Sequence, residues 1–215
     1  MQKLDFISIS EGDNEKAFIF FHGWNGNKHS FENLPSILNV ENIDWYFPEG
    51  PYSSEDNADG KSWAYQSSPG VYEVKETKKL LDAFIKNHIS TKYKLENVFI
   101  MGFSQGAAVC YELYFNTLYR WGGIFPVAGF LRDPKGMNAY REIILSQYQK
   151  STPILIGHGA KDNIISIDVS NKIYNFLLEK EANVNFMQYN GGPKISINYL
   201  REVKKYILNE CEQEL

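Results

Sequence analysis

The chain of 215 residues has few cysteines, no long apolar run and no excess of positive charge. Cys110 and Cys211 are too few and too far apart in sequence to form a disulfide framework or a zinc knuckle, so we expect two reduced thiols. No apolar run approaches the roughly 20 residues that a membrane-spanning helix needs, and the N-terminus lacks the apolar core of a signal peptide. We therefore expect a cytoplasmic protein without stable membrane insertion.

The charge is also unremarkable, with a formal net value of -4 and lysines scattered through helical patterns. A nucleic-acid partner is therefore not expected. Repeats, low-complexity tracts and interdomain linkers are absent from the sequence. Because 43% of the residues are hydrophobic and 15% are aromatic, the chain can bury a large core, and we expect residues 1–215 to form one domain. The aromatic content also leaves room for an apolar patch that would support a homodimer.

Short β-rich runs alternate with longer helical patterns along the chain. The expected strands are 4–10, 17–22, 43–48, 97–103, 121–129, 152–158 and 184–189. Several are nearly continuous apolar runs, which is typical of central strands covered on both faces. Amphipathic helices are expected at 71–90, 166–180 and 195–210. The core-facing residues of the first of these would be Val74, Leu81, Phe84, Ile85 and His88. The βαβα order predicts a doubly wound α/β fold with a mainly parallel sheet.

The motif GFSQG (102–106) follows the most apolar strand and precedes a helical pattern. In this context GxSxG indicates a nucleophile elbow, a tight strand-to-helix turn that exposes the serine hydroxyl while the glycines leave room for the turn. Ser104 is therefore the candidate nucleophile. The backbone N–H of Gln105, at the start of the helix, would bind a developing oxyanion. A purely structural serine turn is the alternative.

Two further loops follow apolar strands. FFHGWNGNKHSF (20–31) is rich in glycine, and the backbone N–H of Trp24 is the candidate second oxyanion donor. His22 is expected to organise that loop through hydrogen bonds. LIGHGAKDNIIS (155–166) delivers Asp162, a carboxylate downstream of the serine, as the candidate acid. An ordinary Asp-Asn turn is the alternative interpretation of this aspartate.

HGWNG, GFSQGAA, GHGAKDNIIS and YNGG followed by a C-terminal helix together resemble the phospholipase/carboxylesterase family of α/β hydrolases, which includes acyl-protein thioesterases and small bacterial carboxylesterases. The similarity runs from about residue 17 to the C-terminus. GKSWAYQ (60–66) resembles the family's aromatic pocket segment and would place Trp63 near the substrate. The resemblance implies an α/β-hydrolase fold and hydrolysis of carboxylic esters or thioesters by Ser104 and Asp162, without a metal or cofactor. Segments 50–70 and 130–150 are expected to wall the acyl pocket.

The sequence departs from this family at one position. Members resembling this chain carry a histidine after the glycines of the last strand, where Pro193 stands here, and all four histidines of the chain lie upstream of it. The ring nitrogen of proline is part of an amide and cannot accept the serine proton. In serine proteases, loss of the triad histidine lowers turnover by roughly six orders of magnitude.

The sequence leaves four explanations of Pro193 open. The chain could be a non-catalytic relative that binds an ester, a lipid or an acylated partner. Another base could substitute, either Lys194 with a pKa lowered by burial, or His22 or His158 turned toward the serine. The proline could be a single-residue change in an otherwise active hydrolase. Finally, the last turn could lie elsewhere in the sequence.

Overall fold

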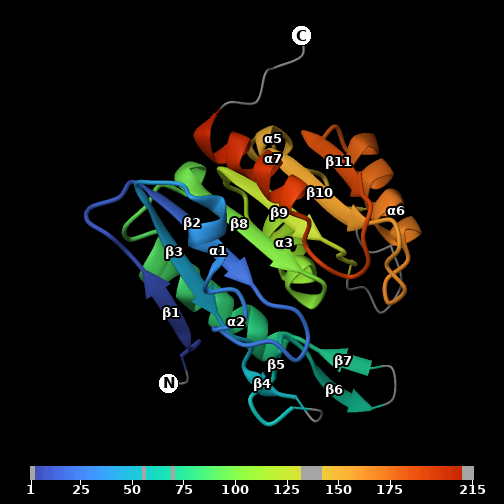
Figure 1. Cartoon of the computed structure of the whole chain (residues 1–215), viewed down its shortest axis with the longest axis horizontal. Coiled ribbons are helices and arrows are strands. Elements are labelled where there is room, and N and C mark those ends of the chain that lie inside the picture. Colours follow the sequence, from blue (N-terminus) through green and yellow to red (C-terminus); the bar gives the residue numbers. More distant parts are fainter. Residues whose placement is uncertain (1–2, 55–56, 69–70, 132–141, 210–215) are drawn as a thin grey trace.

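The computed structural model describes residues 3–54, 57–68, 71–131 and 142–209. Its centre is a seven-stranded sheet in the order β1-β3-β2-β8-β9-β10-β11 (Figure 1). The strands are β1 (Phe6–Ile9), β2 (Lys16–Phe21), β3 (Ile43–Pro48), β8 (Val98–Phe103), β9 (Gly123–Val127), β10 (Ile154–Gly159) and β11 (Val184–Tyr189). Strand β1 pairs antiparallel with β3 at one edge, and all other neighbours in this sheet are parallel. The prediction of a mainly parallel sheet is confirmed.

Helices cover both faces of this sheet. On one face pack α2 (Lys75–Phe84), α3 (Gln105–Asn116) and α6 (Ile167–Glu179), and on the other pack α1 (Leu34–Leu38) and α7 (Ile197–Leu208). A short helix, α5 (Gln147–Ser151), precedes β10. Side chains of β2 alternate between the two layers, with Ile19 and Phe21 in the first and Phe18 and Phe20 in the second. Burial on both sides explains why the central strands have no polar alternation.

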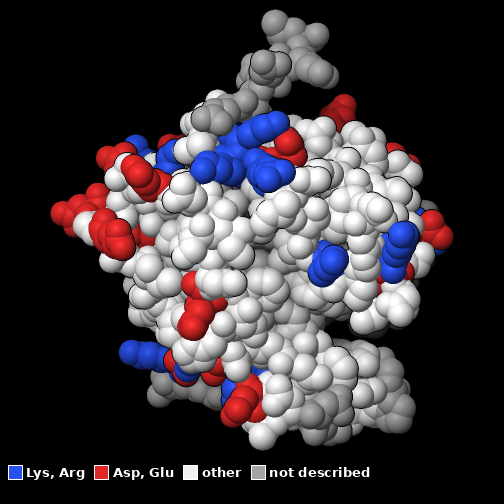
Figure 2. All heavy atoms as spheres, in the orientation of Figure 1, with Lys and Arg blue, Asp and Glu red and all other residues white. Residues whose placement is uncertain are grey.

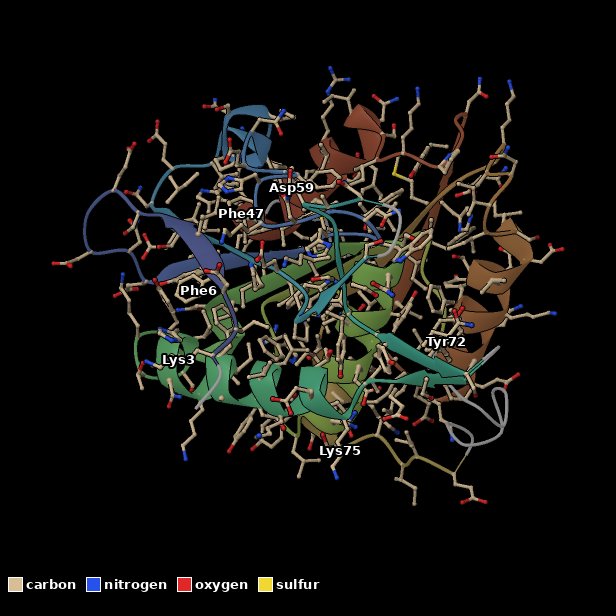
Figure 3. All side chains as sticks on the ribbon, turned by 90° about the horizontal axis from the view of Figure 1, so that it is seen from below. Lys3, Phe6, Phe47, Asp59, Tyr72 and Lys75 are labelled. Carbon is tan, nitrogen blue, oxygen red and sulfur yellow. The ribbon has the colours of Figure 1, made fainter. Side chains whose placement is uncertain are left out.

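Two small hairpins extend beyond the carboxyl edge of the sheet. They pair β4 (Tyr52–Ser53) with β5 (Lys61–Ser62), and β6 (Tyr65–Ser68) with β7 (Val71–Glu73). Figure 1 shows both hairpins below the sheet. Figure 3, the view from below, shows Tyr72 on the second hairpin, which extends toward the side of the molecule that carries α6. The predicted pocket segment 50–70 therefore contributes to structures at this edge.

The first predicted helix, 71–90, is wrong in two places. Residues 71–73 form β7, and α2 begins after them. Beyond Phe84 the helix widens into a π-helical turn, Ile85–Ile89. Because a π turn holds more residues than an α turn, the buried position falls on Ile89, which is 0% exposed. His88 is exposed instead, and its ring packs on Phe6.

Among the residues that the structure describes, no helix combines the length and apolar character needed to cross a bilayer. Figure 2 shows basic side chains gathered over α7, where Arg201, Lys204 and Lys205 lie, and few charges over the middle of that face. Cys110 is buried and unpaired, as predicted. Cys211 lies outside the described residues, as do residues 132–141 of the predicted pocket segment 130–150.

Candidate active site

Ser104 occupies a tight turn between β8 and α3. Its backbone has φ 53° and ψ -114°, and a positive φ of this kind costs a non-glycine residue on the order of 1–3 kcal/mol. A Cβ atom on Gly102 would lie 2.2 Å from the carbonyl oxygen of Gly106, and one on Gly106 would lie 2.0 Å from that of Phe21. The N–H of Ser104 donates to the carbonyl of Val127 at 2.8 Å. Close backbone packing therefore holds a half-buried serine in the geometry of a nucleophile elbow.

The loop after β2 lies directly against this turn. A Cβ atom on Gly23 would lie 3.2 Å from the Phe103 ring and 3.5 Å from the Cβ of Ser104. Trp24 follows with a side chain that is 56% exposed. The loop closes on itself through a hydrogen bond of 3.1 Å from the N–H of Gly26 to the carbonyl of Gly23. The two predicted oxyanion donors, the N–H groups of Trp24 and Gln105, thus belong to segments that touch beside Ser104.

The side chain of Gln105 ties the elbow to the segment between the two hairpins. Its Oε1 accepts the N–H of Trp63 at 2.8 Å, and its Nε2 donates to the Ser62 hydroxyl at 3.0 Å. The indole N–H of Trp63 donates to the carbonyl of His22 at 2.9 Å, and the Thr77 hydroxyl donates to the carbonyl of Trp63 at 2.7 Å. Trp63 is 0% exposed. Trp63 therefore connects the loop after β2, the elbow and α2 from a fully buried position, and its contact with substrate stays a prediction.

Sequence analysis missed the supporting role of Ser62, Thr77 and the Gln105 side chain. Polar residues that are buried in this way are stable only when they are hydrogen-bonded. The only sequence signal was the position of Gln105 within GFSQG, and it pointed to the backbone N–H, not to the amide side chain.

His22 is 1% exposed, and both of its ring nitrogens are engaged. Nε2 accepts the N–H of Gly50 at 3.0 Å, so Nδ1 carries the proton and donates to the carbonyl of Gly23 at 2.6 Å. Burial lowers the pKa of His22 to about 4, which keeps the ring neutral at pH 7. His22 therefore organises the loop, as predicted, and has no free nitrogen for the serine proton.

Asp162 lies on the loop after β10 and its side chain is 1% exposed. Oδ1 accepts the N–H groups of Ile164 at 2.9 Å and Ile165 at 3.0 Å. This is the Asx-type turn of the alternative interpretation. Oδ2 lies 3.6 Å from Nε2 of His158, which is too long for a hydrogen bond. One carboxylate oxygen thus shapes the loop, and the other has no hydrogen-bond donor within the described part of the chain.

His158 is buried beside this aspartate and is also fully engaged. Its Nε2 donates to the carbonyl of Ile165 at 3.0 Å, and its Nδ1 lies 2.7 Å from the hydroxyl of Ser170, which donates to it. The ring is 0% exposed. His158 is therefore a structural histidine in this conformation.

The turn after β11 runs alongside the Asp162 loop. The N–H of Lys161 donates to the carbonyl of Gly191 at 2.8 Å, and a Cβ atom on Gly159 would lie 2.3 Å from the carbonyl oxygen of Gly192. Pro193 is exposed and follows directly. The turn that contains Pro193 therefore lies next to the loop of the predicted acid, Asp162.

Among the described residues, no hydrogen bond joins the Ser104 hydroxyl to Lys194 or to a histidine. The N–H of Lys194 donates to the carbonyl of Gly192 at 2.8 Å, which puts Pro193 at the centre of a three-residue turn. The Lys194 side chain is exposed and lacks the burial that a lysine base requires. His29 pairs with Glu32 at 2.8 Å on the surface. With His88 on the π-helical turn, all four histidines are accounted for.

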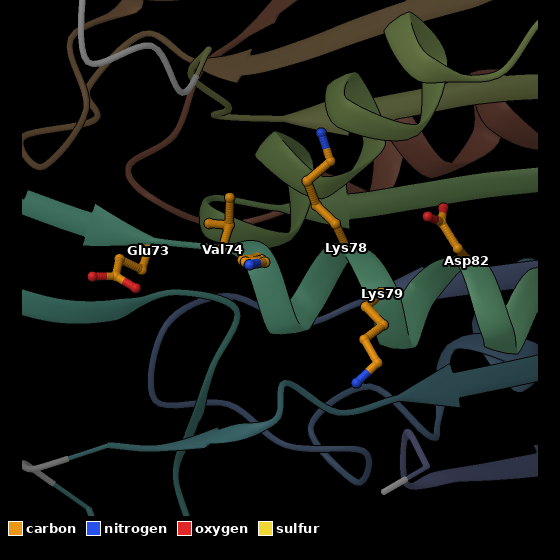
Figure 4. A pocket seen from close by; sticks show the side chains of 6 residues that line it. Glu73, Val74, Lys78, Lys79 and Asp82 are labelled. Carbon is orange, nitrogen blue, oxygen red and sulfur yellow. The ribbon is translucent and has the colours of Figure 1, made fainter. Parts of the chain in front are cut away.

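The sheet order brings these loops to one edge. Strands β2, β8, β10 and β11 run parallel, so their carboxyl ends lie together. Ser104 follows β8 and Asp162 lies on the loop after β10, and β9 lies between these two strands. A surface depression elsewhere, lined by Glu73, Val74, Lys75, Lys78, Lys79 and Asp82, lies along α2 (Figure 4). No residue named as a site candidate contributes to that depression.

Known proteins share this sequence pattern and this fold. The chain matches the Phospholipase/Carboxylesterase family over residues 3–210. It is 28% identical over 182 residues to acyl-protein thioesterase 1 of Kluyveromyces lactis, covering 79% of this chain and 77% of that protein. It is 29% identical over 186 residues to carboxylesterase SOBER1 of Arabidopsis thaliana, covering 78% and 77%. The crystal structure of the Bacillus cereus carboxylesterase superposes with a TM-score of 0.78 at 16% identity, covering 97% of this chain and 95% of that one, which confirms the α/β-hydrolase fold. The chain belongs to the phospholipase/carboxylesterase family.

Proposed function

We propose that this chain is a serine hydrolase of carboxylic esters or thioesters whose turnover is strongly reduced because Pro193 replaces the base. The observation that carries this proposal is the strained turn at Ser104, where φ is 53° and both flanking glycines lack room for a Cβ atom. Strain of this kind persists only where the surrounding structure enforces it, and it concentrates at functional sites. The names of the relatives, acyl-protein thioesterase and carboxylesterase, indicate the substrate class.

In the proposed mechanism, Ser104 Oγ attacks the acyl carbonyl carbon and the carbonyl electrons move onto oxygen. The N–H groups of Trp24 and Gln105 stabilise this oxyanion. The alkoxide or thiolate then leaves with a proton, and water releases the acyl group from Oγ. A serine hydroxyl is a poor nucleophile without a base, so the missing proton acceptor limits both acyl-transfer steps. Oxyanion donors and binding alone retain roughly 10³- to 10⁴-fold acceleration over water.

The second candidate is a non-hydrolytic relative that binds an ester, a lipid or an acylated partner at the same edge. The complete engagement of His22 and His158 favours it, because neither ring can move to Ser104 without breaking two hydrogen bonds. This candidate predicts no measurable turnover and no chemical reactivity at Ser104.

The test is to replace the proline by a base. Pro193→His should raise hydrolysis of short p-nitrophenyl esters by roughly several hundredfold or more, because the imidazole would stand next to the Asp162 loop. The gain should vanish in Pro193→His combined with Ser104→Ala. Pro193→Ala is the matched control, since it relaxes the turn without adding a base, and it should stay near the unaltered chain.

Two results would count against the proposal. If the unaltered chain hydrolyses these esters at ordinary enzymatic rates and Ser104→Ala abolishes the activity, a base exists that we have not identified. If a well-folded Pro193→His variant gains nothing, the turn at Ser104 is not a working elbow and the binding function becomes the better account.

A further inference from the structure

His158 is a buried polar residue that the proposed mechanism does not use. It lies on β10, and its ring contacts Ser170, a buried serine of α6. Because a carbonyl oxygen can only accept, Nε2 carries the ring proton and donates it to the carbonyl of Ile165 at 3.0 Å. Nδ1 is then the acceptor for the hydroxyl of Ser170, at 2.7 Å. A strand and a helix thus fix both the place of the ring and its tautomer.

The loop that carries Asp162 begins with backbone anchors to the neighbouring strand. The N–H of Ala160 donates to the carbonyl of Tyr189, the last residue of β11, at 2.8 Å. The N–H of Lys161 donates to the carbonyl of Gly191 in the turn after β11, also at 2.8 Å. The start of the loop is therefore held by the sheet and by the turn beside it.

The side chains of Asp162 and His158 hold the end of the same loop. Ile165 donates its N–H to Oδ1 of Asp162 at 3.0 Å, and its carbonyl accepts the proton of His158 Nε2 at 3.0 Å. The side chain of Ile164 is 75% exposed, so burial of that side chain does not fix this part of the loop. Ile165 links the two side chains, and the place where His158 holds it determines where its N–H meets the carboxylate.

We propose that His158 is a positioning residue for Asp162, the acid of the proposed reaction, and that it acts through Ile165. This inference rests on the proposed function. If the hydrogen bond to the Ile165 carbonyl is lost, the N–H of the same residue shifts, and Oδ1 of Asp162 loses a fixed donor. The imidazole introduced by Pro193→His would then meet an acid without a fixed orientation. A misplacement of about 1 Å can lower the rate by roughly 10²-fold.

Two substitutions of His158 separate positioning from packing, because each removes a different one of its two hydrogen bonds. His158→Gln brings an amide N–H to the position of Nε2 and keeps the bond to Ile165. His158→Asn reaches only the position of Nδ1 and keeps the bond to Ser170. In the Pro193→His background, His158→Asn should lower kcat for p-nitrophenyl acetate by roughly 10²-fold with KM nearly unchanged, because the acid acts in the transition state. His158→Gln should keep kcat within about tenfold.

Ser170→Ala is the second variant, and it also leaves the bond from His158 to Ile165 in place. In the Pro193→His background it should behave like His158→Gln, and circular dichroism checks that each variant is folded. Nitrogen NMR of the unaltered chain tests the assignment without catalysis. The His158 signals, identified by their loss in His158→Gln, should show a protonated Nε2 and an unprotonated Nδ1.

The inference is overturned if NMR shows the opposite tautomer of His158. It is also overturned if folded His158→Asn and His158→Gln lose kcat equally while Pro193→His itself is active, and in that case the proposed function stands. A folded but inactive Pro193→His rejects the proposed function, and this inference falls with it.

Discussion

At the residue scale, the candidate site has few nitrogen atoms that are free to accept a proton. His22 and His158 lie on the loops that carry the candidate residues, but both ring nitrogens of each histidine already form hydrogen bonds. Lys194 is exposed and lacks the burial that a lysine base requires. A nearby basic residue is therefore not a base unless its lone pair is free and its pKa is suitable.

Acid stability should report the state of His22. Burial sets its pKa at about 4 against 6.5 in the unfolded chain. Between these values the unfolded state binds more protons, so stability is fully present above pH 6.5 and falls as the pH drops to 4, by roughly 3 kcal/mol. Urea unfolding across this range should show a smaller loss for His22→Asn, although that variant starts less stable. His29→Asn, at an exposed histidine, should follow the unaltered chain, and equal slopes in all three proteins would contradict the assignment.

At the scale of elements, the sequence patterns predicted all seven strands of the main sheet. They also predicted helices at 166–180 and 195–210, which correspond to α6 and α7. Burial on one or both faces of an element requires an apolar pattern along it, and this pattern can be recognised in a single sequence. The two hairpins were missed because their strands have only two to four residues each, too short for a clear periodicity. The shift of burial from His88 to Ile89 was missed because a π turn leaves no signature in an α-helical pattern.

The same limit applies to Trp63, whose aromatic motif suggested contact with substrate. Its position depends on hydrogen bonds to Gln105, His22 and Thr77, from segments far apart in sequence. Trp63→Phe removes the indole donor and leaves the carbonyl of His22 buried without its partner, so the free energy of unfolding should fall by about 1–3 kcal/mol. Chemical denaturation followed by circular dichroism measures this change. Trp24→Phe, at a side chain that is 56% exposed, is the control and should change the free energy of unfolding by less than about 0.5 kcal/mol. Equal losses in the two variants would contradict a stabilising role for the Trp63 indole N–H.

At the scale of the whole molecule, parallel strands gather the loops after β2, β8, β10 and β11 at one edge. This is why motifs spread over some 170 residues of sequence, from His22 to Pro193, could be predicted to lie at one edge of the sheet from the amino-acid sequence alone. Topology brings the segments together but does not decide reactivity. Under the proposed function, the residue at position 193 determines whether the site has a base.

The most direct test of this account is the rate at which a fluorophosphonate labels Ser104, with the modified residue located by peptide mass spectrometry. The reagent reacts rapidly only with an activated serine. Its labelling rate therefore reports whether a proton acceptor activates Ser104, and the natural substrate is not needed. We predict slow labelling of the unaltered chain and labelling of Pro193→His at Ser104 that is faster by roughly 10² or more. Labelling of the unaltered chain as fast as that of the histidine variant would contradict the claim that the site lacks its base.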